Sequence, residues 1–153
     1  MKLRTRFFNA LQDKELAKSE ESFLNSGCFF KGIPVTPKNH EDTNHVTEQE
    51  STFWYLFGVK ETDCYVLLTP SQEKDETGHY KHHTVLFVPR YEEIYRMWMF
   101  VKSKEEFLSQ NKVEEVFYVD EIGKYFAGRK LGKIYLYSGI NSDSGISVAE
   151  PDE

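Results

Sequence analysis

A short run of uncharged residues, Val85 to Val88, constrains the fold of this chain more than any other stretch. Four apolar side chains in succession are too few for a helix of ordinary length, so they predict a strand that is buried on both faces. Pro89 follows at once, and because proline cannot donate a ladder hydrogen bond, the strand must end there. We therefore expect a central strand, with any functional residues in the segment beyond Pro89.

The size and composition of the chain are those of one folded domain. A chain of 153 residues, 39% of them hydrophobic and 29% charged, buries roughly 70% of the surface that its unfolded form exposes. The formal net charge of −6 argues against a nucleic-acid partner, because phosphate binding needs clustered lysine and arginine. Cys28 and Cys64 lack CxxC spacing, which predicts buried free thiols and a reducing, cytoplasmic environment. We expect no signal peptide and no membrane partner.

Helical and strand patterns alternate along the rest of the chain. Apolar residues spaced mostly three, four or seven apart predict one amphipathic helix from Leu3 to Leu24. Ser103 and Glu106 form a capping box, which starts a helix that buries Phe107 and Leu108. Further strands are expected at Cys28–Val35, Cys64–Thr69, Val116–Val119 and Ile134–Tyr137.

Local signals also predict how the strands are related. The polar stretch Pro70 to His82, with a turn at Thr77-Gly78, predicts a long hairpin that pairs its two flanking strands antiparallel. Pro34 favours an edge position for the first strand. Asp120 is placed to cap a helix from Glu121 to Ala127, and a strand on either side of that helix predicts a parallel crossover. The fold class is therefore α/β, a mixed sheet of about five to six strands with helices on both faces.

Residues that could bind a metal or catalyse a reaction are sparse. The sequence has no Gly-x-Ser-x-Gly elbow and no His-Glu-x-x-His motif. His79 and His83 are weak metal candidates, because strand alternation sends His82 to the opposite face and leaves two imidazoles at most on one side. A solvated hairpin is the favoured interpretation. We expect neither a catalytic residue nor a metal site in this chain.

An aromatic segment beyond Pro89 is the strongest candidate for a functional surface. Trp98 lies on a stretch that also carries Tyr91, Tyr95 and Met97, which is the composition of a contact surface or a binding hot spot. Composition alone favours the alternative that Trp98 packs against its own domain. Both interpretations stay open at this point.

Several short motifs, taken in order, resemble the N-terminal domain of the prolidase and aminopeptidase P family. They are Gln49-Glu50-Ser51-x-Phe53, Phe57-Gly58-Val59, Cys64-Tyr65, Leu86-Phe87-Val88-Pro89-Arg90 with Trp98, Ser103-Lys104-Glu105, Tyr118-Val119-Asp120-Glu121-Ile122 and Gly139-Ile140-Asn141-Ser142-Asp143-Ser144-Gly145. The resemblance covers Gln49 to Gly145 well and the first helix loosely. It departs from the family's pattern at Thr47-Glu48, where a charge is reversed, and at Phe100, where the family usually has glycine.

The resemblance implies a domain that has no catalytic residues of its own. It divides the chain into that domain, residues 1–145, and the start of a linker, residues 146–153, to a C-terminal catalytic domain. In the family, the second domain holds two divalent metals, expected here to be manganese, and cleaves peptide bonds next to proline. The domain seen here would pack in a homodimer and wall an active site for proline-containing dipeptides or short peptides. Trp98 and Arg90 are the implied contact residues, and Tyr95 joins them because it lies on the same segment.

Two other functions remain open. The same pair of domains occurs in a histone chaperone subunit that has lost its metals, so one alternative is a protein-binding module of a metal-free pseudo-peptidase. The other is a free-standing small α/β binding protein. The motif Leu86 to Arg90, followed by Trp98, favours the peptidase branch.

Overall fold

The computed structural model describes residues 2–35, 48–129, 131–140, 145 and 147. The expected linker at 146–153, apart from Ser147, and residues 141–144 of the motif at 139–145 therefore lie outside the described residues. The helices, strands and 3₁₀ helices (η) are α1 (Lys2–Leu16), α2 (Glu20–Leu24), β1 (Ser26–Lys31), α3 (Ser51–Phe57), β2 (Tyr65–Lys74), β3 (Tyr80–Val88), η1 (Glu93–Met97), α4 (Lys104–Asn111), β4 (Glu115–Tyr118), η2 (Val119–Glu121), α5 (Ile122–Gly128) and β5 (Lys133–Leu136). Within the described ranges, no helix is both long enough and apolar enough to cross a bilayer.

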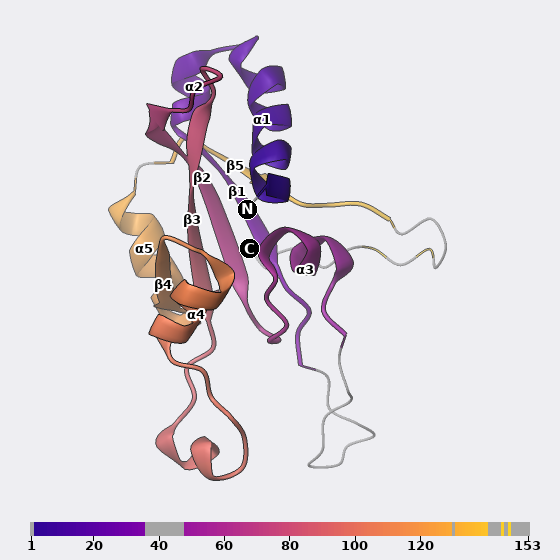
Figure 1. Ribbon diagram of the computed structural model, residues 1–153, viewed down its shortest axis with the longest axis vertical. Helices are drawn as coiled ribbons and strands as arrows, with labels where there is room; N and C mark the ends of the chain where they lie inside the picture. Colours follow the sequence, from indigo (N-terminus) through magenta and orange to yellow (C-terminus); the bar gives the residue numbers. More distant parts are fainter. Residues whose placement is uncertain (1, 36–47, 130, 141–144, 146, 148–153) are drawn as a thin grey trace.

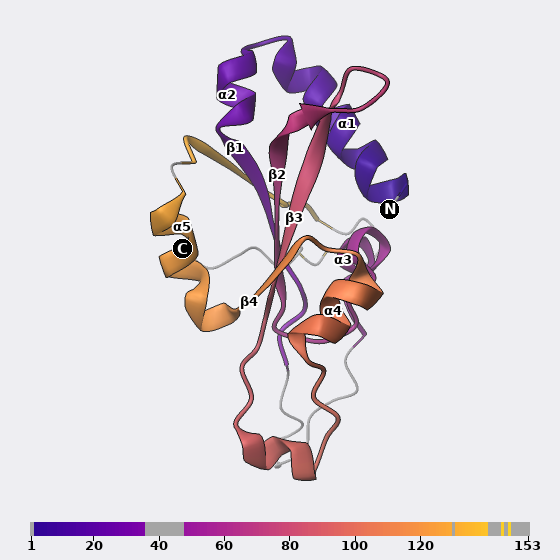
Figure 2. The ribbon, with the colours of Figure 1, turned by 60° about the vertical axis from the view of Figure 1, so that its left-hand side comes forward.

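The strands form one twisted sheet with helices on both faces (Figure 1). Its five strands lie in the order β4-β3-β2-β1-β5. β2 is antiparallel to both of its neighbours, whereas β1 pairs parallel with β5 and β3 pairs parallel with β4. Figure 2 shows α1, α3 and α4 on one side of the sheet and α5 on the other. The predicted mixed sheet and the internal position of β3 are confirmed.

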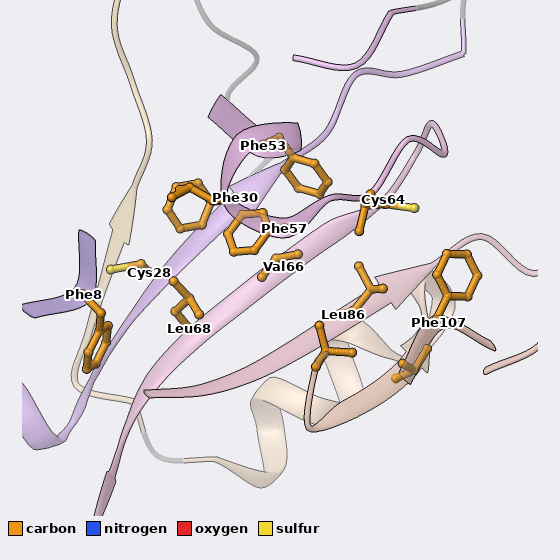
Figure 3. Packing of buried hydrophobic residues seen from close by; sticks show 14 of the residues in the cluster. Phe8, Cys28, Phe30, Phe53, Phe57, Cys64, Val66, Leu68, Leu86 and Phe107 are labelled. Atoms are coloured by element: carbon orange, nitrogen blue, oxygen red, sulfur yellow. The ribbon is translucent and has the colours of Figure 1, made fainter. Parts of the chain in front are cut away.

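Side-chain alternation along β3 divides the core into two clusters. Leu86 and Val88 belong to the larger cluster, which α1, α2, α3 and α4 cover and Figure 3 shows in part. Val85 and Phe87 belong to the smaller cluster, which lies beneath α5. All four side chains are buried. Because both faces of β3 are covered, both sets of residues must be apolar, which explains the uninterrupted run in the sequence.

The single N-terminal helix predicted over Leu3–Leu24 is wrong, because the chain breaks into α1 and α2. Ser19 caps the second helix, and its Oγ accepts a hydrogen bond from the backbone N–H of Ser22 at 3.3 Å. The break folds α2 back against α1, where the rings of Phe8 and Phe23 pack with their centroids 5.6 Å apart. A serine cap inside an apolar repeat therefore outweighs the continuity of that repeat.

Two expectations about the strands also need correction. β1 is not an edge strand, since it lies between β2 and β5. It ends at Lys31, so Pro34 lies beyond the last ladder pair and interferes with no hydrogen bond of the sheet. β2 continues to Lys74 rather than ending at Thr69. The strands β4 and β5 run parallel as a crossover requires, but they lie at opposite edges of the sheet.

The capping box at the start of α4 is confirmed. The Oγ of Ser103 accepts the N–H of Glu106 at 3.2 Å, and the carboxylate of Glu106 accepts the N–H of Ser103 at 2.8 Å. Phe107 is buried as predicted, but Leu108 is 36% exposed. Only one face of this short helix meets the sheet, so adjacent apolar residues cannot both be buried.

Cys28 and Cys64 are buried free thiols, as predicted. Burial raises the pKa of Cys28 to about 12 and raises the pKa of Cys64 as well. Both sulfurs therefore stay protonated near neutral pH and behave as small apolar side chains.

The side chain of His82, on β3, packs against α1 in an environment that disfavours its charged form. Its Nδ1 lies 3.1 Å from the Oγ1 of Thr84, and its Nε2 lies 3.3 Å from the Oγ1 of Thr5. Burial lowers the pKa of His82, and the positive charge of Arg4 lowers it further. The folded protein therefore keeps this imidazole neutral at pH values where the unfolded chain is protonated.

We expect this difference to make the fold less stable in mild acid. An unfolded histidine binds its proton near pH 6.5, so stability falls as the pH drops from about 6.5 toward the lower folded pKa of His82. One group contributes at most about 1.4 kcal/mol per pH unit. Urea denaturation between pH 7.5 and 5.5 measures the slope, which should be smaller in His82→Gln. An equal slope in that variant would assign the effect to other groups.

Candidate contact surface

The chain between β3 and α4 projects beyond the end of the sheet (Figures 1 and 2). We refer to residues 92–100 of this projection as the lobe, and all nine of them are exposed. Six carry large apolar side chains: Ile94, Tyr95, Met97, Trp98, Met99 and Phe100. Side chains that remain exposed contribute little to folding, and a contiguous apolar group of them is typical of a binding surface.

Local hydrogen bonds hold the backbone of the lobe in the single turn η1. The N–H groups of Trp98 and Met99 donate to the carbonyl oxygen of Tyr95 at 3.0 and 2.9 Å, and the N–H of Tyr95 donates to Glu92 O at 3.0 Å. Trp98 is nevertheless 79% exposed. The alternative that Trp98 packs against its own domain is therefore wrong, whereas its role in a contact stays a prediction.

Arg90 lies at the base of the lobe rather than at its tip. Its Nε and Nη2 donate to the two carboxylate oxygens of Asp120 at 3.0 and 3.3 Å, and its Cζ lies 3.8 Å from the centre of the Tyr118 ring. The helix cap predicted at Asp120 is therefore wrong, because this carboxylate pairs with Arg90 and makes no cap hydrogen bond to α5. Arg90 ties the segment leaving β3 to β4 and η2.

A small cavity of about 70 Å³ lies under the base of the lobe. Tyr91, Met99 and Phe107 are among the residues that line it. Burial raises the pKa of Tyr91, and the nearby carboxylate of Asp63 raises it further. The base of the lobe is therefore partly desolvated, in contrast to its exposed tip.

His79 and His83, the two weak metal candidates, are not brought together. The Nε2 of His79 lies 3.1 Å from Asp13 on α1, whereas the Nε2 of His83 lies 2.6 Å from Glu115 on β4. The prediction that they share a face is wrong, because His79 precedes β3 and does not follow its alternation. In the described part of the chain, no three His, Cys, Asp or Glu side chains are grouped so that they could hold a metal ion.

Ile94 and Phe100 are contact candidates that the sequence pattern does not single out. Both are exposed beside Trp98 on the lobe. The available signal is an apolar density greater than one buried helical face needs, because Met97, Met99 and Phe100 are added to Ile94, Tyr95 and Trp98, which alone have helical spacing. That signal identifies the segment but not the direction of each side chain.

Comparison with known proteins gives one consistent family. The family model described as the aminopeptidase P N-terminal domain matches residues 4–135. The human Xaa-Pro dipeptidase is 35% identical over 133 residues, which are 86% of this chain and 25% of that protein. The mouse Xaa-Pro dipeptidase is 36% identical over 105 residues, 68% of this chain and 20% of that protein. The chain thus spans a quarter or less of the length of these relatives.

The solved structures agree at the level of the fold. Proline aminopeptidase P II from Yersinia pestis superimposes with a TM-score of 0.61 at 23% identity, covering 87% of this chain and 30% of that one. An identity this low carries the fold alone, whereas the family model extends over most of the sequence. This chain therefore belongs to the family of aminopeptidase P N-terminal domains, the domain type that begins prolidase and aminopeptidase P.

Proposed function

We propose that this chain is the non-catalytic N-terminal domain of a metal-dependent Xaa-Pro dipeptidase. The observation that carries this proposal is the identity to human Xaa-Pro dipeptidase, 35% along 86% of the chain. The catalytic work would belong to a C-terminal domain, which binds two divalent metals that we propose to be manganese. The residues described here do not fit such a site, because they contain no group of three metal-ligating side chains. The buried free thiols of this chain, Cys28 and Cys64, suit a cytoplasmic protein.

The lobe would be the part of this domain that serves the reaction. In a homodimer of the full-length protein, its exposed apolar side chains would wall the active site of the neighbouring subunit. Trp98 offers a flat apolar ring against which a proline ring can pack, and Tyr95 and Phe100 extend that surface. Such a wall would exclude water and favour short proline-containing peptides over long chains. Arg90 would support the wall from below.

The decisive variant is Trp98→Ala in the natural full-length product. Its KM for Gly-Pro with added manganese should rise about tenfold, the effect of losing about 1.4 kcal/mol of binding. Thermal stability should not change, because the Trp98 side chain is exposed. The present chain of 153 residues, assayed alone, should be inactive. The matched control is Tyr55→Ala, which removes an exposed aromatic ring from α3 instead of the lobe.

Three results would change this conclusion. Hydrolysis by the present chain alone would contradict a non-catalytic role. Equal KM values for Trp98→Ala and Tyr55→Ala would contradict the role of the lobe. Inactivity of the full-length product would favour the protein-binding module of a metal-free pseudo-peptidase, which the exposed lobe also suits.

A further inference from the structure

We propose that Lys102 and Glu61 form a positioning pair that fixes the orientation of the lobe, and thereby of Trp98. The lobe joins the domain through two limbs, one leaving β3 and the other returning to α4. Arg90 fastens the outgoing limb to Asp120, and Lys102 fastens the returning one. The consequence for substrate rests on the proposed function of the lobe, whereas the mechanical role of the pair does not.

The pair on the returning limb is short and partly shielded from solvent. The Nζ of Lys102 lies 2.6 Å from the Oε1 of Glu61, and the two side chains are only 23% and 30% exposed. The same ammonium lies 5.2 Å from the centre of the Phe107 ring. Partly buried charges are screened by salt much less than surface charges, so this pair holds its partners more firmly than an exposed pair does.

Glu61 belongs to a turn that is itself fixed to the domain. Its carbonyl oxygen accepts a hydrogen bond from the Nε2 of Gln49 at 2.8 Å. Two residues later, the N–H of Asp63 donates to the carbonyl oxygen of Ile33 at 3.0 Å. Lys102 is therefore anchored to the body of the domain rather than to another moving segment.

The other described contacts that hold the lobe are at its base. The ring of Tyr95 packs on Tyr91 with the centroids 5.7 Å apart, and Met99 and Phe100 line the cavity beneath the lobe. All nine lobe residues are exposed, and the hydrogen bonds of η1 connect the lobe to itself. With both limbs fastened, the lobe stands at one angle to the sheet. Without the Lys102–Glu61 pair, it would pivot about Arg90 and present Trp98 in many directions.

Hydrogen exchange on the chain described here tests the mechanical role. Lys102→Met keeps the apolar stem over Phe107 but removes the charge, and amides of residues 92–100 should then exchange at least threefold faster. The control is Lys81→Met, which breaks a pair of similar length, 2.9 Å to Glu73, on the hairpin. The exchanged pair Glu61→Lys with Lys102→Glu should restore protection. Unchanged exchange in Lys102→Met, or equal acceleration in Lys81→Met, would overturn the proposal.

A kinetic cycle in the full-length product tests the link to substrate. Lys102→Met should raise the KM for Gly-Pro about threefold with little change in kcat, and should have no further effect in a Trp98→Ala background. The same effect in both backgrounds would show that Lys102 does not act through Trp98 and would overturn the link. If Trp98→Ala alone leaves KM unchanged, the proposed function fails, while the exchange experiment still decides whether the pair holds the lobe.

Discussion

Phe87→Asp is expected to prevent the domain from folding. Phe87 is fully buried and lies at the centre of the smaller core cluster beneath α5. Its ring contacts Phe29, Phe117 and Tyr125, with centroid distances of 6.4, 6.1 and 5.4 Å. Replacing a buried phenylalanine by a small residue costs about 3–5 kcal/mol, and burying an unpaired carboxylate adds several more. Together these losses match the roughly 5–15 kcal/mol that stabilise a typical domain.

Circular dichroism and thermal denaturation measure this effect. Phe87→Asp should show no cooperative unfolding transition, whereas Phe100→Asp, which places the same charge on the exposed lobe, should unfold at nearly the wild-type temperature. Phe87→Leu should fold with a lower midpoint, because it creates a cavity without adding a charge. A cooperative transition in Phe87→Asp within a few degrees of the wild type would contradict the assigned position of β3.

Arg4→Met should have the second largest effect, about 3–5 kcal/mol, because it leaves buried acceptors without a donor. The guanidinium is buried, and it joins four segments of the chain. It donates hydrogen bonds to Leu56 O (3.3 Å), Thr84 Oγ1 (3.2 Å), Lys112 O (3.0 Å) and Asn111 O (2.9 Å). The last two carbonyls lie at the C-terminal end of α4, where a positive charge also stabilises the helix dipole.

Urea denaturation near pH 7 measures the loss from Arg4→Met. Arg6→Met is the matched control, since Arg6 lies on the same helix but is exposed, and its replacement should change the free energy of unfolding by less than about 0.5 kcal/mol. Equal losses in the two variants would show that the four hydrogen bonds of Arg4 contribute no more than an exposed arginine does.

The parts of the fold that could be predicted depend on neighbours in sequence. The strand at Val85–Val88 follows from an apolar run ended by proline, and the capping box follows from Ser103 and Glu106 alone. The aromatic composition around Trp98 likewise indicated the candidate surface. Each of these signals is complete within a few residues, so no knowledge of the tertiary structure is needed to interpret it.

The parts that could not be predicted depend on partners far away in the chain. Asp120 has the local pattern of a helix cap, yet its carboxylate accepts a hydrogen bond from Arg90, 30 residues earlier in the chain. Arg4 resembles a residue of a solvated helix face, but its acceptors lie between 52 and 108 residues further on. The exposure of Trp98 was equally open, because composition does not reveal whether a core lies within reach. The Lys102–Glu61 pair also joins separate segments.

The parallel pairing of β1 with β5 determines when the sheet is complete during synthesis. Ser26 begins β1 opposite Lys133 of β5. The backbone groups of β1 that pair with β5 therefore stay unpaired until almost all described residues have left the ribosome. Until then, the edge beside Cys28 and Phe29 has unpaired backbone groups next to apolar side chains, which is a template for pairing with other chains. A nascent chain stopped before Lys133 would thus be prone to aggregate, and β5 protects the domain by closing that edge.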